Sequence, residues 1–426
     1  MKNNVVVGID VSKDFSYLCM IGPDGKKIGK PFKVLHTLEG LNFALKRLKE
    51  VENQYGSKCI LVMEATGFYY SRLLFHFFHQ SNLEVWMVNP IQSNSIKNIK
   101  VRKVKNDKVD AYRIALLFLL GEAVPVRPPR EDLAEINILC RQYFRLSDDF
   151  TKYKNHLVSL VCQVFPNYDK VFSDITSESS LYILENFPSP NKLLKADKET
   201  LVQTIAKLSR KGRNWALEKY DALIDVAREA LILGCAPPAA ETAILADIAV
   251  LRALNEQMRV VENKIRDLSS NVREIKLVSS IPGFGILSAA AFFSEIRDFC
   301  SFKSPKKLTA FCGIDPAVLQ SGKFKGSQVK ISKRGSVFLR RVLYTAALAS
   351  IRKKRNGDYF NPVLVDYYEC KIQSKPKNVA LVAVMHKLVR YIFAVLRDEK
   401  SFKLITPEEH LKAFEEARLS PLKMSA

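Results

Sequence analysis

The sequence predicts an α/β domain followed by two mostly helical domains. Three observations support this fold class. The first part of the chain begins with three strand-like segments and continues as alternating helices and strands. Two long segments in the middle repeat apolar residues at spacings of three and four, which is typical of packed helices. From about residue 276 the composition shifts again, into a further compact and mostly helical segment.

The N-terminal domain, residues 1–125, is predicted to hold a mixed sheet covered by helices. Strands are expected at VVVGIDV, FSYLCMIG, KKIGKPFKV, CILVMEA and EVWMVNP, and helices over residues 38–54, from about 69 and from about 107. Three meandering strands followed by helix–strand alternation specify such a sheet. The segment AVPVRPPRED that follows is predicted to be a linker, because proline disfavours regular structure.

Residues 130–275 are predicted to form a coiled coil that is interrupted by an insertion over residues 166–240. Two heptad seams predict an antiparallel pair, within one chain or between chains, and two amphipathic helices in an ordinary bundle are the alternative. The first seam comprises Ile136, Leu139, Tyr143, Leu146, Phe150, Tyr153, Leu157, Leu160 and Val164, and the second Leu251, Leu254, Met258, Val261, Ile265, Leu268 and Val272. The insertion contains the basic patch LSRKGR, to which no function is assigned.

Residues 276–400 are predicted to form the third domain, and residues 401–426 a polar tail. The domain opens with SSIPGFG. IPGFG is similar to the turn of helix-hairpin-helix modules, whose backbone N–H groups contact phosphates. A simple helix–helix turn that uses Gly283 and Gly285 is the alternative.

The charge balance predicts a polyanionic partner. The chain carries 66 Lys and Arg against 44 Asp and Glu, a formal net charge of +22. Neutralising phosphates releases counterions, so nucleic acid is the first expectation, a membrane surface the second, and a merely basic soluble protein the third. The eight cysteines occur singly, as expected for reduced, mostly buried thiols. The apolar runs are too short or carry His386, Lys387 and Arg390, so no membrane span is expected, and a cytoplasmic, nucleoid-associated prokaryotic protein is predicted.

Four acidic residues are predicted to converge on one edge of the N-terminal sheet. Asp10 and Glu64 end two strands, while Asp107 and Asp110 lie one helical turn apart on a shared face. Four gathered carboxylates repel one another unless divalent cations neutralise them. Such oxygen ligands suit Mg²⁺ or Mn²⁺, and two of these ions stabilise both the attacking and the leaving oxygen of a phosphodiester.

Each acid also has a simpler interpretation. Asp10 can cap a turn, Glu64 can be a surface charge, and Asp107 can be a helix N-cap with Asp110 in the favourable first turn. Together, however, they occupy the positions that a ribonuclease H-like sheet requires for metal binding. GIDVSK also resembles the opening of sugar kinases, but the later phosphate and nucleotide loops of that superfamily are not found. The neighbouring basic residues are predicted to hold a nucleic-acid backbone: Lys97, Lys100, Arg102, Lys103, Lys105 and Lys108.

The C-terminal segment QSGKFKG contains a candidate nucleophile, Ser321, in a strongly basic setting. Residues 322–341 carry no acid, and their cations are predicted to bind phosphates: Lys323, Lys325, Lys330, Lys333, Arg334, Arg340 and Arg341. The residues alone do not choose Ser321 over Ser327, Ser332 or Ser336. Phe324 and Tyr344 are candidates for base stacking, although a core role is the favoured expectation for Tyr344.

The ordered motifs GIDVSK, MEATGFYY, VNP, KNDKVDA, SIPGFG, CGIDP, QSGKFKG and SKRG…LRRVLY resemble the DEDD-type insertion-sequence transposases, whose relatives include the pilin-gene invertases. The resemblance implies a RuvC-like domain, a coiled-coil middle and a C-terminal serine domain. It implies that Asp10, Glu64, Asp107 and Asp110 form a metal-binding tetrad and that Ser321 is the nucleophile. It also implies a structured guide RNA, the bridge RNA, which pairs with target and donor DNA. The sequence departs from the family in its longer middle insertion.

The predicted function is therefore a DNA transposase or recombinase that cuts and rejoins strands through a covalent phosphoserine, with Mg²⁺ or Mn²⁺ as cofactor. Its predicted partners are donor DNA, target DNA, a guide RNA and further copies of the chain, as a dimer or tetramer. A metal-dependent nuclease of the resolvase kind, in which water attacks, is the first alternative. An architectural nucleic-acid binder without enzymatic activity is the second.

Overall fold

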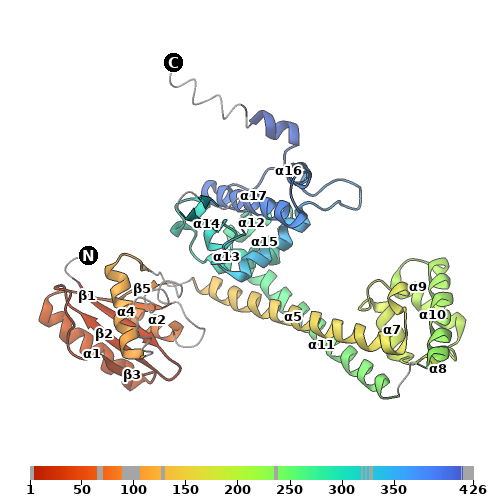
Figure 1. Cartoon of the computed structure of the whole chain (residues 1–426), viewed down its shortest axis with the longest axis horizontal. Helices are drawn as coiled ribbons and strands as arrows, with labels where there is room; N and C mark the ends of the chain where they lie inside the picture. Colours follow the sequence, from red (N-terminus) through yellow and green to blue (C-terminus); the bar gives the residue numbers. More distant parts are fainter. Residues whose placement is uncertain are drawn as a thin grey trace. The chain divides into compact units, whose positions relative to one another are not determined.

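The computed structural model divides into two compact units, residues 1–129 and 130–426 (Figure 1). It describes residues 4–64, 71–88, 106–125, 130–234, 238–317, 320–321, 324–325, 330–413 and 415. The first unit is an α/β domain and the second is mostly helical, which confirms the predicted fold class.

The first unit is built on a six-stranded mixed sheet with the order β3-β2-β1-β4-β5-β6. Its strands are β1 (Val5–Val11), β2 (Phe15–Ile21), β3 (Phe32–Leu35), β4 (Cys59–Glu64), β5 (Glu84–Val88) and β6 (Val124–Pro125). β1 pairs antiparallel with β2 and parallel with β4, so the three meandering strands open the sheet and the later strands extend it from β1.

Helices cover both faces of this sheet. α1 (Leu38–Tyr55) and α2 (Ser71–Gln80) pack on one face, and α4 (Asp107–Leu119) packs on the other. Local signals define α1, because the Thr37 side chain caps its first turn and Gly56 ends it in the left-handed conformation. Alternate residues of β1 and β4 enter the two apolar clusters, as the period of two in a strand requires.

The proline-rich segment after α4 is not only a linker, so that prediction is wrong at its start. Val124 and Pro125 form β6, which pairs antiparallel with β5 through Met87 and Trp86. Proline is tolerated here because β6 lies at the edge of the sheet, where a missing N–H costs no ladder hydrogen bond. A two-residue strand carries too little periodicity to be recognised from sequence.

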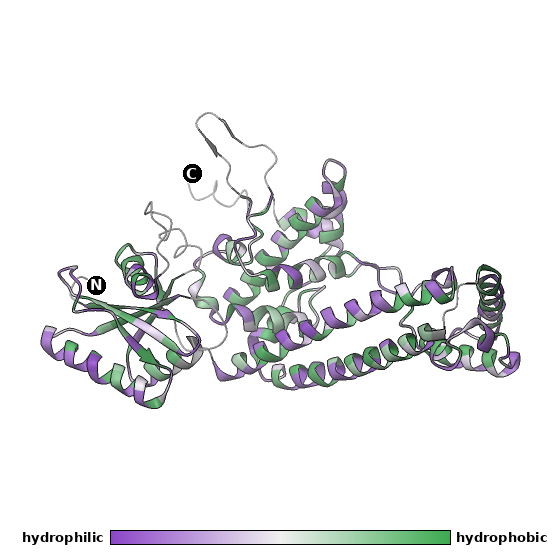
Figure 2. Ribbon diagram, turned by 60° about the horizontal axis from the view of Figure 1, so that its bottom comes forward, coloured by the Kyte–Doolittle hydropathy of each residue, from purple (hydrophilic) through white to green (hydrophobic). Residues whose placement is uncertain are grey.

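The second unit contains an antiparallel pair of long helices within one chain. These are α5 (Glu131–Val164) and α11 (Pro238–Ser269), which Figure 2 shows side by side. The start of α5, at Leu133 and Ile136, shares a core with Ile265 near the end of α11. The end of α5, at Leu157 and Val161, shares a second core with the start of α11. The predicted seams therefore face each other along one hairpin-like arm.

The insertion forms a helical lobe at the far end of this arm. It contains α6 (Tyr168–Val171), α7 (Glu178–Asn186), α8 (Pro190–Leu193), α9 (Lys198–Ser209) and α10 (Arg213–Leu233). Its core includes Phe165 and Tyr168 together with Ile244 and Ile248 of α11, so the lobe and the arm are one packed body.

The rest of the second unit is a helical domain with its own large core. It comprises α12 (Arg273–Ser279), α13 (Ile286–Ile296), the 3₁₀ turn η1 (Phe299–Ser301), α14 (Pro305–Phe311), β7 (Gln320–Ser321), β8 (Phe324–Lys325), α15 (Val337–Ser350), α16 (Pro362–Ile372) and α17 (Lys377–Asp398). Within the described residues, α17 is the one helix long and apolar enough to cross a membrane. More than half of its most apolar window is buried, because α17 is a central helix of this core.

The IPGFG segment is the turn between α12 and α13. Gly283 has a φ of 102°, and a Cβ there would lie 2.0 Å from the Ser350 hydroxyl oxygen of α15. Packing on α15 thus explains this glycine, and both interpretations of the segment place a turn between two helices here.

Candidate functional site

Asp10 and Glu64 lie side by side at the carboxyl ends of two parallel strands. β1 and β4 pair in parallel up to Ile9 and Met63, and the next residues in register are Asp10 and Glu64. Val6 of β1 and Ile60 and Val62 of β4 pack against α4. Because side chains alternate along a strand, Asp10 and Glu64 belong to the same face as these residues. The two carboxylates therefore share one edge and one face of the sheet.

α4 crosses this face with its first turn over β1 and β2. Lys108, in the first turn, places its ammonium 5.6 Å from the ring centroid of Tyr17, the register partner of Asp10. Farther along, the backbone of Ala111 lies over Gly8, and Phe118 meets Trp86 of β5 edge-on. The helix thus runs from β2 across β1 to β5. Its N-terminal turn, which carries the other two acids, lies toward the Asp10 end of β1.

The first turn of α4 carries one half-buried acid, Asp107, and one buried acid, Asp110. Asn106, not Asp107, is the N-cap, since its side chain accepts a hydrogen bond from the Lys108 N–H, and Asp107 is the first helical residue. Asp110 is 5% exposed. Its carboxylate accepts a hydrogen bond from the Arg113 guanidinium at 2.7 Å, and Arg113 is itself buried. This ion pair was not expected from the sequence.

Glu64 is a buried carboxylate that, within the described residues, forms no hydrogen bond or ion pair, and it is 6% exposed. Burial of an unpaired charge is costly, so such a group calls for a cation. The donor set at this edge consists of carboxylate oxygens, which fits Mg²⁺ or Mn²⁺. In the part of the chain that the structure describes, no three acidic, His or Cys side chains stand close enough to enclose a metal ion. The fold places Asp10 and Glu64 side by side at one edge, and the first turn of α4 carries Asp107 and Asp110 toward the Asp10 end of β1.

The basic residues before and at the start of α4 are only partly described. Lys97, Lys100, Arg102, Lys103 and Lys105 lie outside the described residues. Lys108 is exposed beside Tyr17, so one cation of this group is placed at the acidic edge.

Ser321 is the last residue of β7, a two-residue strand that pairs antiparallel with β8. Its register partner is Phe324, and Gln320 pairs with Lys325. Two residues, Gly322 and Lys323, separate the strands in sequence and lie outside the described residues, as does Ser327. Ser321 is therefore paired with a residue whose neighbour in the sequence, Lys325, is basic.

Hydrogen bonds join the two ends of the segment that carries Ser321, residues 315–317 and 330–332. We call these joined ends the root of the segment. The Ser332 hydroxyl donates to the Asp315 carboxylate at 2.6 Å, and the Ser332 N–H donates to the Asp315 carbonyl at 2.7 Å. Ala317 and Lys330 are joined by a further backbone bond of 2.9 Å. Of the alternative serines, Ser332 thus already uses its hydroxyl in a hydrogen bond to Asp315. Ser336 caps α15 and donates its hydroxyl to Glu295 at 3.0 Å.

The cations after Ser321 divide into two groups. Lys330, Lys333 and Arg334 are exposed, and within the described residues none of them forms an ion pair. Arg340 instead donates to the Gly335 carbonyl at 3.0 Å, and Arg341 pairs with Asp148 of α5 at 2.7 Å. The first group is free to contact a polyanion, whereas the second also has a structural role.

Tyr344 is not a core residue, so the favoured expectation for it is wrong. It lies on α15 with 45% of its surface exposed. The apolar face of α15 is formed instead by Leu339, Val342 and Leu343.

Sequence reasoning missed the residues that hold the candidate functional groups in place. Arg113 follows Asp110 by three residues, a spacing that signals a helical ion pair and was available in the sequence. Glu295 binds Arg141 and Asn137 of α5 as well as Ser336. No local pattern signals that contact, because these residues are about 150 positions apart.

Two family models match this chain. A model described as a transposase, of the DEDD type of insertion sequence IS110, matches residues 7–166. A model described as the transposase family of IS116, IS110 and IS902 matches residues 275–362. The matched regions contain the four acids and Ser321 respectively, and together they cover more than half of the chain.

Several curated proteins are similar in sequence. An uncharacterized 43.6 kDa protein of insertion element IS110 from Streptomyces coelicolor is 24% identical over 63% of this chain and 64% of its own length. The transposase for insertion sequence element IS1111A of Coxiella burnetii is 29% identical over 33% of this chain and 38% of its own length. The pilin gene-inverting protein of Moraxella bovis is 30% identical over 30% of this chain and 38% of its own length.

Among solved structures, the chain is similar to RuvC of Thermus thermophilus. RuvC in complex with a Holliday junction substrate aligns with 29% of this chain and 99% of its own, at 14% identity and a TM-score of 0.23. A second RuvC structure from the same organism aligns at 17% identity and a TM-score of 0.22.

Proposed function

The chain belongs to the DEDD-type insertion-sequence transposases, enzymes that act on DNA, and from this membership we propose that it cuts and rejoins DNA strands through a covalent phosphoserine at Ser321. Divalent cations assist, held by the carboxylates of the acidic edge. These carboxylates belong to Asp10, Glu64, Asp107 and Asp110. The observation that carries the metal assignment is Glu64, a buried carboxylate with no partner among the described residues.

In the proposed reaction, the Ser321 hydroxyl oxygen attacks the phosphorus of a phosphodiester. A bond forms between phosphorus and the serine oxygen as the bond to one DNA oxygen breaks. The hydroxyl proton leaves, and the departing DNA oxygen gains a proton. Mg²⁺ or Mn²⁺, when bound, stabilises negative charge on the attacking and leaving oxygens. One phosphoester replaces another, so a new DNA hydroxyl can reverse the step and rejoin strands without ATP.

The exposed cations near Ser321 hold the DNA backbone in this proposal. Lys330, Lys333 and Arg334 have no carboxylate partner among the described residues, so phosphates can neutralise them. Phe324, the register partner of Ser321, and the exposed Tyr344 are candidates to stack on unpaired bases.

Substitution of Ser321 tests the covalent step. Purified protein is incubated with labelled DNA carrying the junctions of its element, with the RNA transcribed from the element and with Mg²⁺, and is then denatured. We expect a protein–DNA adduct from wild type and from the control Ser327→Ala, and neither cleavage nor adduct from Ser321→Ala. Cleavage that persists in Ser321→Ala would establish the nuclease alternative.

Substitution of Asp10 tests the acidic edge. We expect Asp10→Asn to lose metal-dependent cleavage by at least about 100-fold, because a ligand to the catalytic cations is lost. Asp14→Asn, an exposed acid four residues away, is the matched control and should retain activity. Full activity in Asp10→Asn would point to the architectural binder instead.

The acids and Ser321 lie in different units, so the proposed site requires the two units to meet, within one chain or across subunits of a dimer or tetramer. We favour a site that is shared between two subunits, because the long arm of α5 and α11 suits contacts between chains. Mixing Asp10→Asn chains with Ser321→Ala chains distinguishes the two arrangements. Restored adduct formation would show that one chain supplies the metal site and another the serine, whereas no restoration would place both in one chain.

A structured RNA from the element is proposed to choose the DNA sites by base pairing, as RNA-guided enzymes do. The strong positive charge of the chain supports an RNA partner. We expect changes in the pairing segments of the noncoding RNA to redirect the adduct to matching DNA. Adduct formation at an unchanged site without that RNA would contradict RNA guidance.

A further inference from the structure

A cavity of about 230 Å³ lies between α16, α17 and residues 407–411 of the second unit. Tyr367 of α16, Tyr391 and Lys387 of α17, and His410 contribute to its wall. A cavity of roughly 150 Å³ takes a benzene molecule, so this one has room for a phosphate group and part of the attached sugar. Neither the acids nor Ser321 line it.

Positive charge converges on this cavity. The Lys387 ammonium lies 5.0 Å from the ring centroid of Tyr367, and the Lys371 ammonium lies 5.2 Å from the same centroid. Burial lowers the pKa of Lys387, and the charges of Arg390 and Lys371 lower it further. Burial and then the charge of Lys387 lower the pKa of His410. The charges of Lys387, Lys371 and Arg390 therefore repel one another.

The cavity wall provides little to balance this charge. Lys387 is half-buried, and within the described residues it forms no ion pair. Asp366 is the one carboxylate in the wall, and its side chain is exposed to solvent. A lysine held in this way is destabilised by burial and by like charges, and an anionic ligand relieves both effects.

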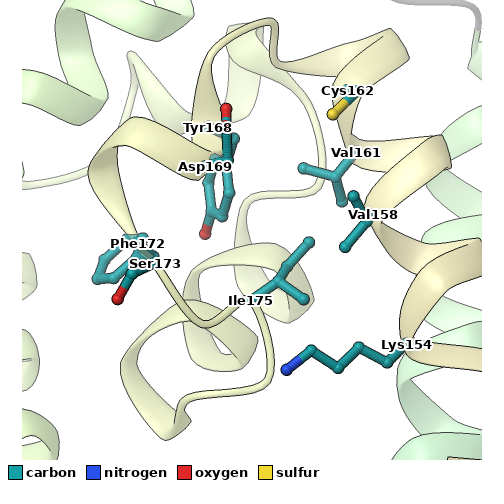
Figure 3. A pocket seen from close by; sticks show the side chains of 9 residues that line it. All are labelled: Lys154, Val158, Val161, Cys162, Tyr168, Asp169, Phe172, Ser173 and Ile175. Carbon is teal, nitrogen blue, oxygen red and sulfur yellow. The ribbon is translucent and has the colours of Figure 1, made fainter. Parts of the chain in front are cut away.

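A second cavity shows how this protein pairs another partly buried lysine with a carboxylate. It lies between α5 and α6 and measures about 70 Å³ (Figure 3). Its lysine, Lys154, pairs with Asp174 at 2.7 Å, and its other walls are largely apolar, with Val158, Val161 and Ile175. That cavity is small and its charge is neutralised, so it offers nothing to an anion.

We propose that the cavity between α16, α17 and residues 407–411 binds a phosphate group of a nucleic-acid strand, with Lys387 as its direct contact. Lys371 and Arg390 supply the surrounding positive field, and Tyr367 and Tyr391 pack against the sugar or base next to the phosphate. A nucleic-acid phosphate is the anion that a transposase of net charge +22 meets at high local concentration. The site is separate from Ser321 and anchors a strand rather than cutting it.

Binding of a single-stranded trinucleotide to the full chain tests this proposal. A trinucleotide has few phosphates, so the loss of one phosphate contact changes its affinity measurably. We expect Lys387→Met to bind it at least fivefold more weakly than wild type. The slope of log affinity against log salt should fall by about 0.7, as for one lost phosphate contact to a single strand. Ultraviolet cross-linking of wild type should map to peptides that contain Tyr367 or Tyr391.

Lys377→Met is the matched control, because Lys377 lies on the same helix, is exposed and is absent from the cavity wall. It should bind like wild type. Unchanged binding by Lys387→Met, or cross-links only in other peptides, would overturn the proposal. Equally tight binding of inorganic phosphate would overturn the assignment to nucleic acid.

The stability of the variants completes the test. We expect Lys387→Met to unfold at the same temperature as wild type or higher, because it removes an unpaired, half-buried cation. Should it fail to fold, Leu411→Trp fills the cavity from an exposed position and should weaken trinucleotide binding to the same extent. Unchanged binding by that variant would refute the site. None of these measurements requires strand cleavage, so they stand apart from the phosphoserine proposal.

Discussion

Gly8 of β1 lies directly against Ala111 of α4, so that a Cβ atom at Gly8 would stand 2.0 Å from the Ala111 carbonyl oxygen and 2.6 Å from the Ala115 nitrogen. Both of these atoms belong to the backbone of α4, so no flexible side chain could move aside for a Cβ atom at Gly8. The absence of a side chain at Gly8 thus sets how closely α4 approaches the sheet. It therefore also sets the height above β1 of the first turn of α4, which carries Asp107 and Asp110.

We therefore expect Gly8→Ala to push α4 away from the sheet. The free energy of unfolding of the first unit should fall by about 1–3 kcal/mol or more, as for other overpacked cores, and metal-dependent cleavage should fall with it. Thermal unfolding and the adduct assay measure the two effects. Gly285→Ala is the control, since a Cβ there meets open space and its φ of −73° suits any residue. Equal behaviour of the two variants would contradict this role of Gly8.

The buried ion pair of Arg113 and Asp110 predicts a large effect on stability. Arg113→Met leaves Asp110 charged and buried without this partner, and such a broken pair costs about 3–5 kcal/mol. Urea unfolding followed by Trp86 fluorescence, in a Trp215→Phe background, reports the first unit, because the chain has 2 tryptophans.

The control for this variant is Arg259→Met. Arg259 pairs with Glu256 at the same spacing of three residues and the same 2.7 Å, but both side chains are exposed. Arg259 lies in the second unit, so unfolding of this variant is followed by Trp215 fluorescence in a Trp86→Phe background. An exposed pair of this kind contributes little, so the control should leave that unfolding curve unchanged. If Arg113→Met behaved like the control, burial would not determine the strength of the pair.

The hydrogen bonds between Ser332 and Asp315 predict where the segment that carries Ser321 will loosen. Ser332→Ala removes the 2.6 Å bond to the carboxylate. We expect faster amide hydrogen exchange at Ala317, Ser332 and Lys333, whose N–H groups close the root of this segment, and a slower rate of adduct formation.

Ser279→Ala is the matched serine substitution, because its exposed hydroxyl donates only to a carbonyl within its own helix. It should change neither exchange at the root nor adduct formation. Wild-type exchange in Ser332→Ala would show that the backbone bonds alone hold the root closed.

His386 predicts how stability depends on pH. Its Nε2 lies 2.9 Å from the Ile314 carbonyl oxygen, next to Asp315. Burial lowers the pKa of His386 below its ordinary value of about 6.5, and the bond to Ile314 offsets part of this effect. The unfolded chain then binds a proton more readily than the folded chain. The contribution of His386 is therefore complete above about pH 6.5 and is lost as the pH falls through the lower, folded-state pKa.

We expect the free energy of unfolding of wild type to fall between pH 7 and pH 5 more steeply than that of His386→Gln. Urea titrations at several pH values measure the difference. An identical pH dependence in the two proteins would show that His386 does not contribute to it.

Much of the first unit follows from local sequence patterns. β1, β2, β4 and β5, together with α1, α2 and α4, lie where alternation and helical spacing predict them. β3 covers only Phe32–Leu35, whereas a strand was predicted over residues 26–34. The strand ends place Asp10 and Glu64 at one edge, because parallel neighbours end on the same side. β6 was missed, since two residues at an edge carry no period. The core role expected for Tyr344 was wrong, because helical spacing does not reveal which face of α15 meets the core.

The sequence by itself determined the fold class, the two long helices of the arm, the strand-end positions of Asp10 and Glu64 and the run of cations that follows Ser321, because these depend on residue type and on spacing along the chain. Only the tertiary structure decided which charges are paired and which are left unpaired. Arg113 neutralises Asp110, Asp148 engages Arg341, and Glu64 and Lys387 stand buried or half-buried without an ion pair among the described residues. The physical reason is that the cost of a buried charge depends on its neighbours in space, and these come together only when distant segments pack.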